Sequence, residues 1–258
     1  MKAGINIVSL NQLVKSESDF KRIVGQLADM GYSYLQISSL SLKADEIARV
    51  VQSSGLPVYL THSSLERILN DTDAVLRENE MYGCKNIGLG WLSPEVLSDK
   101  NKLAEASEQL ERIGQTMKSK GFTFFLHHHH NEFYKNGAQT AFDYIVENAP
   151  SVHFIIDTYW VQYGGVDPVQ IFERIKNRVE CVHLKDYRLE KVPENHPSDP
   201  YVPRFAPVGS GTLNFPQIIK AAKEAGTQYF FVEQDDASTY PDPLGQVRQS
   251  IEYITKEL

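Results

Sequence analysis

Side chains that can bind a metal follow four consecutive apolar segments in the second half of the chain. These segments run into the sequences LHHHHNEF, IIDTYW, VHLKDY and FVEQDD. The metal-competent residues that they bring are His127 or His129, Asp157, His183 and Glu233. A polar group that directly follows an apolar run is costly to bury without a partner, so four such groups in a row favour a shared partner.

The residue types indicate which partner this is. Imidazole and carboxylate ligands without a thiolate are typical of Mn²⁺, Mg²⁺, Co²⁺, Fe²⁺ or Zn²⁺, so the sequence predicts one divalent metal ion as cofactor. The predicted ligands are His127, Asp157, His183 and Glu233, with His129 as the alternative to His127. Taken singly, each also has a structural explanation: Asp157 as a helix cap, His183 as a hydrogen-bonded core residue, Glu233 as an ion-pair partner.

Further polar residues near these ligands are candidates for catalysis and substrate binding. Strand side chains alternate between two faces, so Lys185 shares a face with His183, and Asp235 shares one with Glu233. We expect Lys185 and Asp235 at substrate height, just above the ligands. The predicted catalytic residues are Glu233 as base, His129 or His127 as second proton carrier, and Lys185 as a group that stabilises negative charge or binds phosphate. The predicted substrate contacts are His62, Trp91, Trp160 and Asp235.

Eight short β-like segments must position these residues, and they alternate with helical patterns. The segments are 3–8, 34–37, 58–61, 86–89, 122–126, 152–156, 180–184 and 229–232. Such alternation predicts a parallel sheet with helices outside it. Because the first segment is not followed by a glycine-rich dinucleotide motif, eight units predict a closed (β/α)8 TIM barrel, with residues 1–258 as a single domain.

Helices are expected between these strands. Ser18 is the expected N-cap of the first helix, and further helices are expected at 43–52, 65–82, 103–118, 141–147, 168–175, 216–225 and 244–257. Glycines at expected helix ends favour left-handed caps at Gly31, Gly55, Gly83, Gly121 and Gly226. The longest loop, 187–208, follows the seventh strand and is expected to lie over the catalytic face.

Composition excludes several classes of protein. The net charge of −7 argues against a general nucleic-acid binder. No run approaches the roughly 18 apolar residues of a membrane span, and the first ten residues lack the long apolar core of a secretion signal. The two cysteines, Cys84 and Cys181, cannot form a disulfide framework. We therefore expect a cytoplasmic protein with no nucleic-acid partner and no membrane partner.

Taken together, the motifs resemble the xylose-isomerase-like barrel superfamily, and the likeness covers essentially the whole chain. This superfamily includes sugar and sugar-phosphate isomerases and epimerases, inosose dehydratases and apurinic-site endonucleases. LHHHHNEF is similar to the family's fifth-strand segment Tyr-His-Asn-His-Asp-Phe-Glu-Phe, with His127, His129, Glu132 and Phe133 matching. DTYWVQYGGVDP, HLKDY, VGSGTLNF and VEQDD match further family motifs.

The resemblance implies an isomerase or epimerase that acts on a sugar or sugar phosphate. It would remove a proton next to a carbonyl through a metal-stabilised enediolate. In ketose epimerases of the family the fifth-strand ligand is a Glu that also transfers protons, whereas His127 stands there in this chain, so a mechanism with two glutamates is in doubt. Barrels of this superfamily often form dimers or tetramers, so a homo-oligomer is compatible with the resemblance.

Other functions stay open at the level of sequence. The same intermediate can expel a leaving group, as in an inosose dehydratase or a 3-keto-sugar lyase. A non-catalytic sugar- or metal-binding barrel and a metal-assisted hydrolase are weaker alternatives. The endonuclease branch needs additional histidine ligands, and none lies between Asp157 and His183. VGSGTL is a weak signal for phosphate binding, so phosphorylation of the substrate is undecided.

Overall fold

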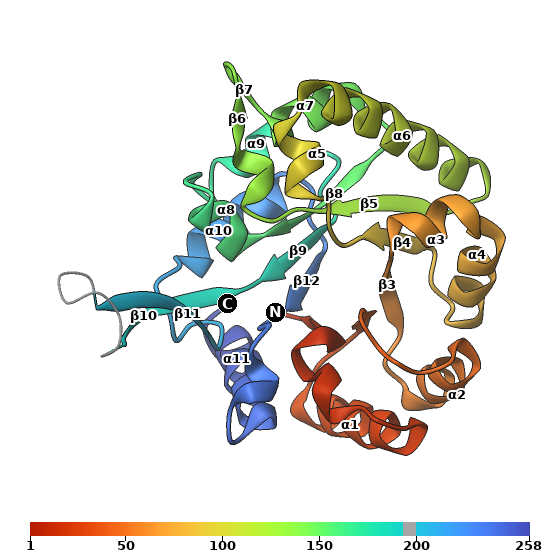
Figure 1. Cartoon of the computed structure of the whole chain (residues 1–258). Coiled ribbons are helices and arrows are strands. Elements are labelled where there is room, and N and C mark those ends of the chain that lie inside the picture. The colour runs from red at the N-terminus through yellow and green to blue at the C-terminus, as the bar shows by residue number, and fades with distance from the viewer. Residues whose placement is uncertain (193–199) are drawn as a thin grey trace.

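The predicted strands form a closed parallel barrel in a computed structural model, which describes residues 1–192 and 200–258 (Figure 1). Around the barrel the strand order is β1, β12, β9, β8, β5, β4, β3 and β2, so the prediction of a TIM barrel is confirmed. The barrel strands are β1 (Gly4–Asn6), β2 (Leu35–Ile37), β3 (Val58–Ser63), β4 (Asn86–Leu89), β5 (Thr123–His127), β8 (His153–Asp157), β9 (Cys181–Leu184) and β12 (Tyr229–Val232).

Helices surround the ring of strands (Figure 1). They are α1 (Glu17–Met30), α2 (Ala44–Ser54), α3 (Leu65–Asn70), α4 (Thr72–Met81), α5 (Pro94–Ser98), α6 (Lys100–Ser119), α7 (Ala141–Asn148), α8 (Thr158–Tyr163), α9 (Ile171–Arg174), α10 (Phe215–Glu224) and α11 (Pro243–Glu257). Short 3-10 helices occur at η1 (Ile7–Leu13), η2 (Asn131–Phe133) and η3 (Ala237–Thr239). The five glycines predicted to adopt left-handed backbone all have positive φ, between 69° and 104°.

Several predicted helix boundaries were wrong. Ser16, and not Ser18, caps α1, because its Oγ accepts a hydrogen bond from the backbone N–H of Asp19. The predicted helix 65–82 is broken at Asp71, whose φ of −142° is not helical and which ends α3 and begins α4. Aspartate competes with the helix backbone through its side chain, which favours such a break.

The βα connections also differ from the prediction in length. The first strand is shorter than 3–8, since Asn6 caps η1 by accepting a hydrogen bond from Val8 N–H. The predicted helix 168–175 is reduced to the four residues of α9. Helices α5 and α8 were not predicted. Their five and six residues are too few for a helical period to stand out in a sequence.

The predicted loop 187–208 contains a hairpin within its described part. Strand β10 (Asp186–Lys191) pairs antiparallel with β11 (Tyr201–Ala206), and Figure 1 shows this hairpin extending away from the barrel. Residues 193–199 of the predicted loop lie outside the described part. At the base of the hairpin, the ring of Phe205 lies 4.8 Å from that of Tyr159 and 5.5 Å from Nζ of Lys185. The base of the hairpin therefore lies near Lys185, but the described part of the loop extends away from the barrel and does not lie over the catalytic face as predicted.

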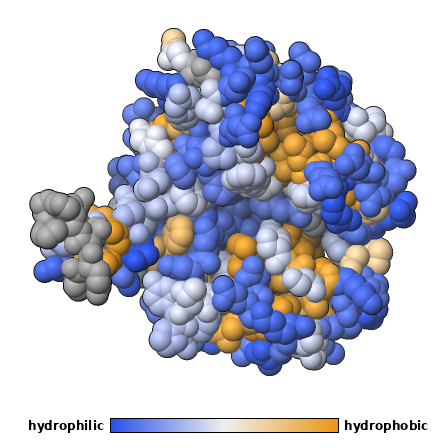
Figure 2. Space-filling model, viewed as in Figure 1, coloured by the Kyte–Doolittle hydropathy of each residue, from blue (hydrophilic) through white to orange (hydrophobic). Residues whose placement is uncertain are grey.

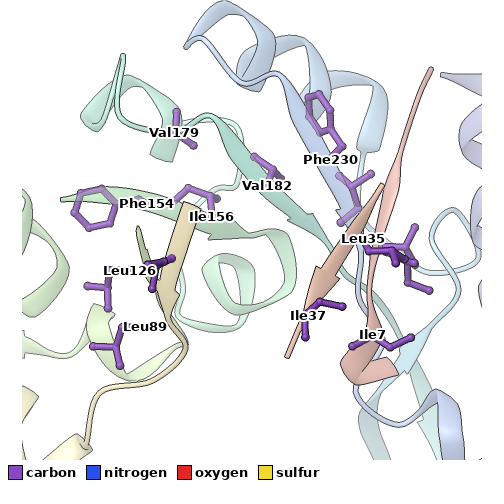
Figure 3. Close-up of a cluster of buried hydrophobic side chains, with 14 of the residues drawn as sticks. Ile7, Leu35, Ile37, Leu89, Leu126, Phe154, Ile156, Val179, Val182 and Phe230 are labelled. Atoms are coloured by element: carbon purple, nitrogen blue, oxygen red, sulfur yellow. The ribbon is translucent and has the colours of Figure 1, made fainter. Parts of the chain in front are cut away.

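Alternation along the strands divides the apolar core into two layers. Residues such as Leu35, Leu126, Ile156 and Val182 belong to the large core between the strands and the helices (Figure 3). The second cluster consists of the other strand positions, with Tyr34, Leu60, Phe125, Ile155, Cys181 and Phe231. Because side chains alternate, this second set fills the inside of the barrel. The residues two positions later on the same strands also point inward and lie directly above this layer.

Candidate metal centre

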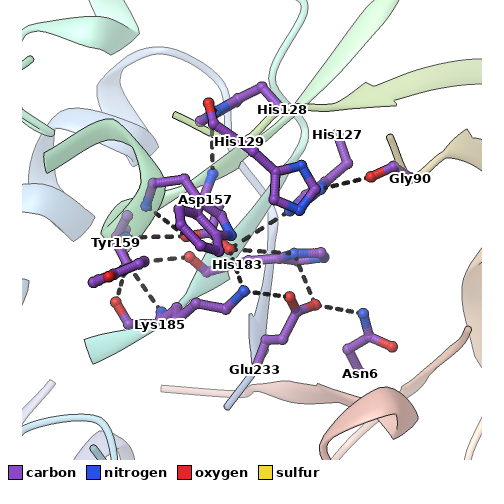
Figure 4. Close-up of polar contacts among 12 residues, drawn as sticks. Asn6, Gly90, His127, His128, His129, Asp157, Tyr159, His183, Lys185 and Glu233 are labelled. Atoms are coloured by element: carbon purple, nitrogen blue, oxygen red, sulfur yellow. Dashed lines mark hydrogen bonds and ion pairs between the residues drawn. The ribbon is translucent and has the colours of Figure 1, made fainter. Parts of the chain in front are cut away.

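Four predicted ligands converge two residues beyond this interior layer. His127 follows Phe125, Asp157 follows Ile155, His183 follows Cys181 and Glu233 follows Phe231 at the same strand period. Each of the four is buried, and one ligand atom of each lies within 4.8 Å of the others. The strands β5, β8, β9 and β12 are consecutive neighbours in the barrel, which brings the four side chains together (Figure 4).

Both histidines are oriented by a hydrogen bond at the ring nitrogen that faces away from the cluster. His127 Nδ1 lies 3.2 Å from the carbonyl oxygen of Gly90, and His183 Nε2 lies 2.7 Å from Oε1 of Gln36. Since an oxygen acceptor requires a proton on each of these nitrogens, the lone pairs of His127 Nε2 and His183 Nδ1 face the cluster. Metal-binding histidines are usually held in this way.

Asp157 serves two purposes with its two oxygens. Oδ1 accepts hydrogen bonds from the backbone N–H groups of Tyr159 and Trp160, each at 3.0 Å, and so caps α8. Oδ2 faces the cluster, 3.5 Å from His127 Nε2. The capping explanation and the ligand explanation are therefore compatible, because each uses a different oxygen.

Lys185 places a buried ammonium group beside the cluster. Its Nζ lies 2.7 Å from Glu233 Oε1, 3.0 Å from Asp157 Oδ2 and 3.1 Å from Asp235 Oδ2. Burial alone would lower the pKa of Lys185, but Asp157 and Glu233 outweigh it and hold the pKa well above its ordinary value. The ammonium therefore keeps its proton, and it balances only one of three nearby carboxylates.

The site fits a divalent cation in both its charge and its free lone pairs. Two negative charges remain after Lys185 is counted, which one divalent ion would balance. Among the described residues, His127 Nε2, Asp157 Oδ2 and His183 Nδ1 are buried without a well-aligned hydrogen bond. Buried polar atoms normally have a partner, and here these atoms point at one another. His127, Asp157, His183 and Glu233 are the residues that can hold a metal.

The pKa values of the carboxylates differ across the site. Burial raises the pKa of Glu233, but His183 and Lys185 have the larger combined effect and hold it well below its ordinary value. Burial raises the pKa of Asp235 to about 6, partly opposed by Lys185. Of these two carboxyl groups, Glu233 is thus the constant anion and Asp235 the group that titrates nearer neutral pH.

The other histidines of the run lie outside the four-residue cluster. The ring of His129 is 4.8 Å from that of His127 and 5.1 Å from that of Trp160, and burial lowers the pKa of His129 to about 3. His128 packs against Phe142 in the helix layer, and its Nε2 accepts a hydrogen bond from Asp157 N–H. His130 stacks on Trp160. The structure therefore groups His127, rather than His129, with the other ligand candidates.

A large cavity opens over the cluster. Its volume is about 1250 Å³, and His62, Trp91, His127, His129, Glu233 and Asp235 are among the residues that line it. Hydrophilic residues dominate the middle of the face shown in Figure 2, with apolar residues beside them. Of the predicted substrate contacts, His62, Trp91 and Asp235 line this cavity, whereas Trp160 instead packs against His129 and His130.

Two amides that were not predicted from the sequence complete the site. Asn6 Nδ2 donates to Glu233 Oε2 at 2.5 Å, and Gln36 Nε2 lies 3.1 Å from His62 Nε2 while its Oε1 contacts His183. Gln36 therefore joins His62 to the cluster. Both amides are buried on strands among apolar residues, and that isolated polar position was the signal that could have revealed them.

The VGSGTL segment folds around a carboxylate. Asp186 accepts hydrogen bonds from the backbone N–H groups of Gly209, Gly211, Thr212 and Leu213, at 2.8 to 3.3 Å. These N–H groups therefore point at Asp186. A backbone cradle for phosphate would need the same groups, so this segment supports a structural role.

The chain matches the model of the xylose isomerase-like TIM barrel family over residues 24–257. It belongs to this family. Among curated relatives of the barrel, an inosose dehydratase from Lacticaseibacillus casei is 26% identical over 166 residues, which cover 59% of this chain and 56% of the relative. The chain thus matches little more than half the length of that relative.

Solved structures show the same fold. A sugar phosphate isomerase/epimerase from Parabacteroides distasonis has a TM-score of 0.78 at 22% identity, with 99% of this chain and 94% of that chain covered. A protein described as IOLI, with a bound zinc atom, has a TM-score of 0.71 at 14% identity and covers 99% of this chain and 97% of its own. Within the described part of the barrel, no helix has the length and apolar character needed to cross a membrane.

Proposed function

We propose that this barrel is a metal-dependent enzyme that removes a proton next to the carbonyl group of a neutral, sugar-like ketone, as isomerases and epimerases do. The observation that carries the proposal is the buried group of His127, Asp157, His183 and Glu233 beneath an open cavity. The chemistry that a divalent ion supplies in such a site is Lewis-acid polarisation of a carbonyl.

Two residues of the chain would perform the proton chemistry. Glu233 presents Oε2 to His183 and Oε1 to Lys185, and it also lines the cavity, so its carboxylate is the candidate base. Lys185 retains its proton and would stabilise negative charge that develops on the substrate oxygen. Asp235, which hydrogen-bonds Lys185 at 3.1 Å, is a second candidate for proton transfer.

Recognition of the substrate would fall to neutral groups. With Gln36 donating to its Nε2, His62 has a protonated Nδ1, and burial holds the pKa of His62 well below its ordinary value. His62 is therefore a neutral donor for a hydroxyl group. Because the amides of the VGSGTL segment bind Asp186, the proposal favours a substrate without phosphate.

Exchange of carbon-bound hydrogen tests this proposal before any product is known. The protein would be loaded with Mn²⁺ or Co²⁺ and incubated in D₂O with ketohexoses and with inososes, and proton NMR would follow the hydrogen next to the carbonyl. The proposal predicts exchange that depends on the metal and is lost in Lys185→Met. Absence of exchange in all of these ketones with fully loaded protein contradicts it.

Elimination is a second candidate, and the pKa of His129 favours it. Strands β5 and β12 are separated in the barrel by β8 and β9, so His129 and Glu233 approach the cavity from different sides (Figure 4). Since the pKa of His129 is lowered to about 3, it is neutral at pH 7 and is a poor proton donor. In an elimination the base that removes the proton can return it to the departing hydroxyl group, which leaves as water, so no separate donor is needed. Mass spectrometry distinguishes the two reactions, because elimination lowers the mass of the ketone by one water and epimerisation leaves the mass unchanged.

A further inference from the structure

The cavity is larger than one sugar ring requires. Ligand pockets of about 300–1,000 Å³ enclose drug-sized molecules, and the cavity over the cluster reaches about 1250 Å³. A single sugar ring is smaller than such molecules, so a ring seated at the cluster leaves much of the space empty. The remainder extends from the ends of β3 and β4 toward α3, α5 and α6, since residues of these elements line it.

An exposed tryptophan marks this outer part of the cavity. Trp91 follows β4, lines the cavity and is 54% exposed, and Leu92 and Val96 line the same region. Trp91 therefore presents an accessible aromatic ring to a ligand in this part of the cavity. Its flat apolar face suits the C–H face of a sugar, while the ring N–H can bind a hydroxyl group.

The cations of the outer part already have acidic partners. Arg67 forms two hydrogen bonds with Glu78, at 2.8 and 3.0 Å. Lys102 pairs with Glu95, and Arg112 lies 3.6 Å from Glu108. Glu105 adds a negative charge to the lining. An anionic group would have to compete with these carboxylates, so the outer part favours a neutral ligand.

We infer that this outer part, defined by Trp91, Leu92, Val96, Leu65 and Gln109, binds a second neutral sugar ring that is joined to the reacting ring. The substrate class is then a neutral glycoside of about disaccharide size. The inference rests on the proposed function for the position of the reacting ring, and it adds the subsite and the size of the substrate. Residues of the outer part and of the metal cluster line one continuous cavity, so a single ligand can occupy both parts.

Binding measurements with non-reacting sugars test the subsite. Isothermal titration calorimetry would compare D-glucose with cellobiose, maltose, sucrose and trehalose on the Mn²⁺-loaded protein, and on the variants Trp91→Ala and Trp91→Phe. Tyr134→Ala is the matched control, since Tyr134 is a 55% exposed aromatic residue that does not line the cavity. We expect at least one disaccharide to bind about tenfold more tightly than glucose. Trp91→Ala should abolish that difference, Trp91→Phe should restore most of it, and Tyr134→Ala should leave it unchanged.

Four results overturn the subsite. The first is equal affinity for glucose and every disaccharide, the second is an equal loss of both in Trp91→Ala, and the third is no disaccharide binding at all. The fourth is tight binding of phosphorylated sugars alone, which would mean that the outer part binds an anionic group and not a neutral ring. Failure of the proposed function has a different signature, namely a protein that does not bind Mn²⁺ or shows no metal-dependent hydrogen exchange. Such exchange together with equal affinities rejects the outer subsite alone.

Discussion

The Nε2 atom of His183 lies 2.7 Å from Oε1 of Gln36, and this contact determines which ring nitrogen of His183 faces the metal site. The same amide reaches His62 through Nε2 at 3.1 Å. One uncharged side chain on β2 therefore links a candidate metal ligand on β9 to a candidate substrate contact on β3. The relationship can be tested without changing any ligand.

Replacement of Gln36 should weaken metal binding. Gln36→Leu removes the acceptor for His183 Nε2–H, so the ring is free to rotate or change tautomer. Loss of such a supporting contact usually costs about 10–100-fold in metal affinity. Competition titration with a fluorescent chelator measures this affinity for Co²⁺ or Zn²⁺. Gln52→Leu is the control, because Gln52 bonds a backbone carbonyl on the exposed surface. Equal metal affinities in wild type and Gln36→Leu would contradict the inference that Gln36 positions His183.

Removal of the Lys185 ammonium should lower the stability of the metal-free protein and increase the stabilisation that metal provides. Lys185→Met leaves Asp157, Glu233 and Asp235 without their shared cation. The metal-free variant should melt at a lower temperature than metal-free wild type, because unpaired buried charges are destabilising. Addition of Mn²⁺ should then raise the melting temperature more in the variant than in wild type, as differential scanning fluorimetry can measure. A smaller rise in the variant contradicts the charge balance described above.

Glu132 should make the stability of the protein depend on pH. Its Oε2 accepts a hydrogen bond from His129 N–H, and burial raises its pKa from 4.5 to about 7. A carboxyl group whose pKa is raised by folding contributes its full stability below the unfolded pKa and loses it as the pH rises through the folded pKa. Wild type should therefore lose up to about 3 kcal/mol relative to Glu132→Gln between pH 4.5 and 7. Urea denaturation at several pH values measures the difference, and a difference that does not change with pH contradicts the assignment.

The close approach of His62 to β4 should make Gly88 intolerant of a side chain. A Cβ atom at Gly88 would lie 2.6 Å from Cδ2 of His62, whereas a Cβ atom at Gly25 in α1 has nothing within 4 Å. Gly88→Ala should destabilise the fold by about 1–3 kcal/mol and displace His62, while Gly25→Ala should stabilise it by about 0.5–1 kcal/mol. Chemical denaturation gives both values, and the carbon-bound ring protons of His62 in NMR spectra report the displacement. Two variants of equal stability would contradict this packing.

The fold was predictable because the strand period and the barrel place consecutive strand ends side by side. That same period predicted that Lys185 and Asp235 lie near the ligands, and their 3.1 Å contact agrees. The choice between His127 and His129 could not be made from the sequence, because β5 ends at His127 and alternation no longer applies beyond it. Asn6 and Gln36 were missed because amides carry no charge and have no distinctive spacing. The hairpin of β10 and β11 was missed because prolines and charges obscure its alternation.

Metal content tests the central claim most directly. Wild type, His183→Ala, Asp157→Ala and the control His153→Ala would be purified, supplied with Mn²⁺, Co²⁺ or Zn²⁺, desalted and measured by inductively coupled plasma mass spectrometry. His153 is the control because it lies at the start of β8 and pairs with Glu180, away from the cluster. The account predicts close to one divalent ion per chain in wild type and in His153→Ala, and little in the other two variants. Wild type that stays free of metal under all three conditions, or His183→Ala that retains a full equivalent, would contradict it.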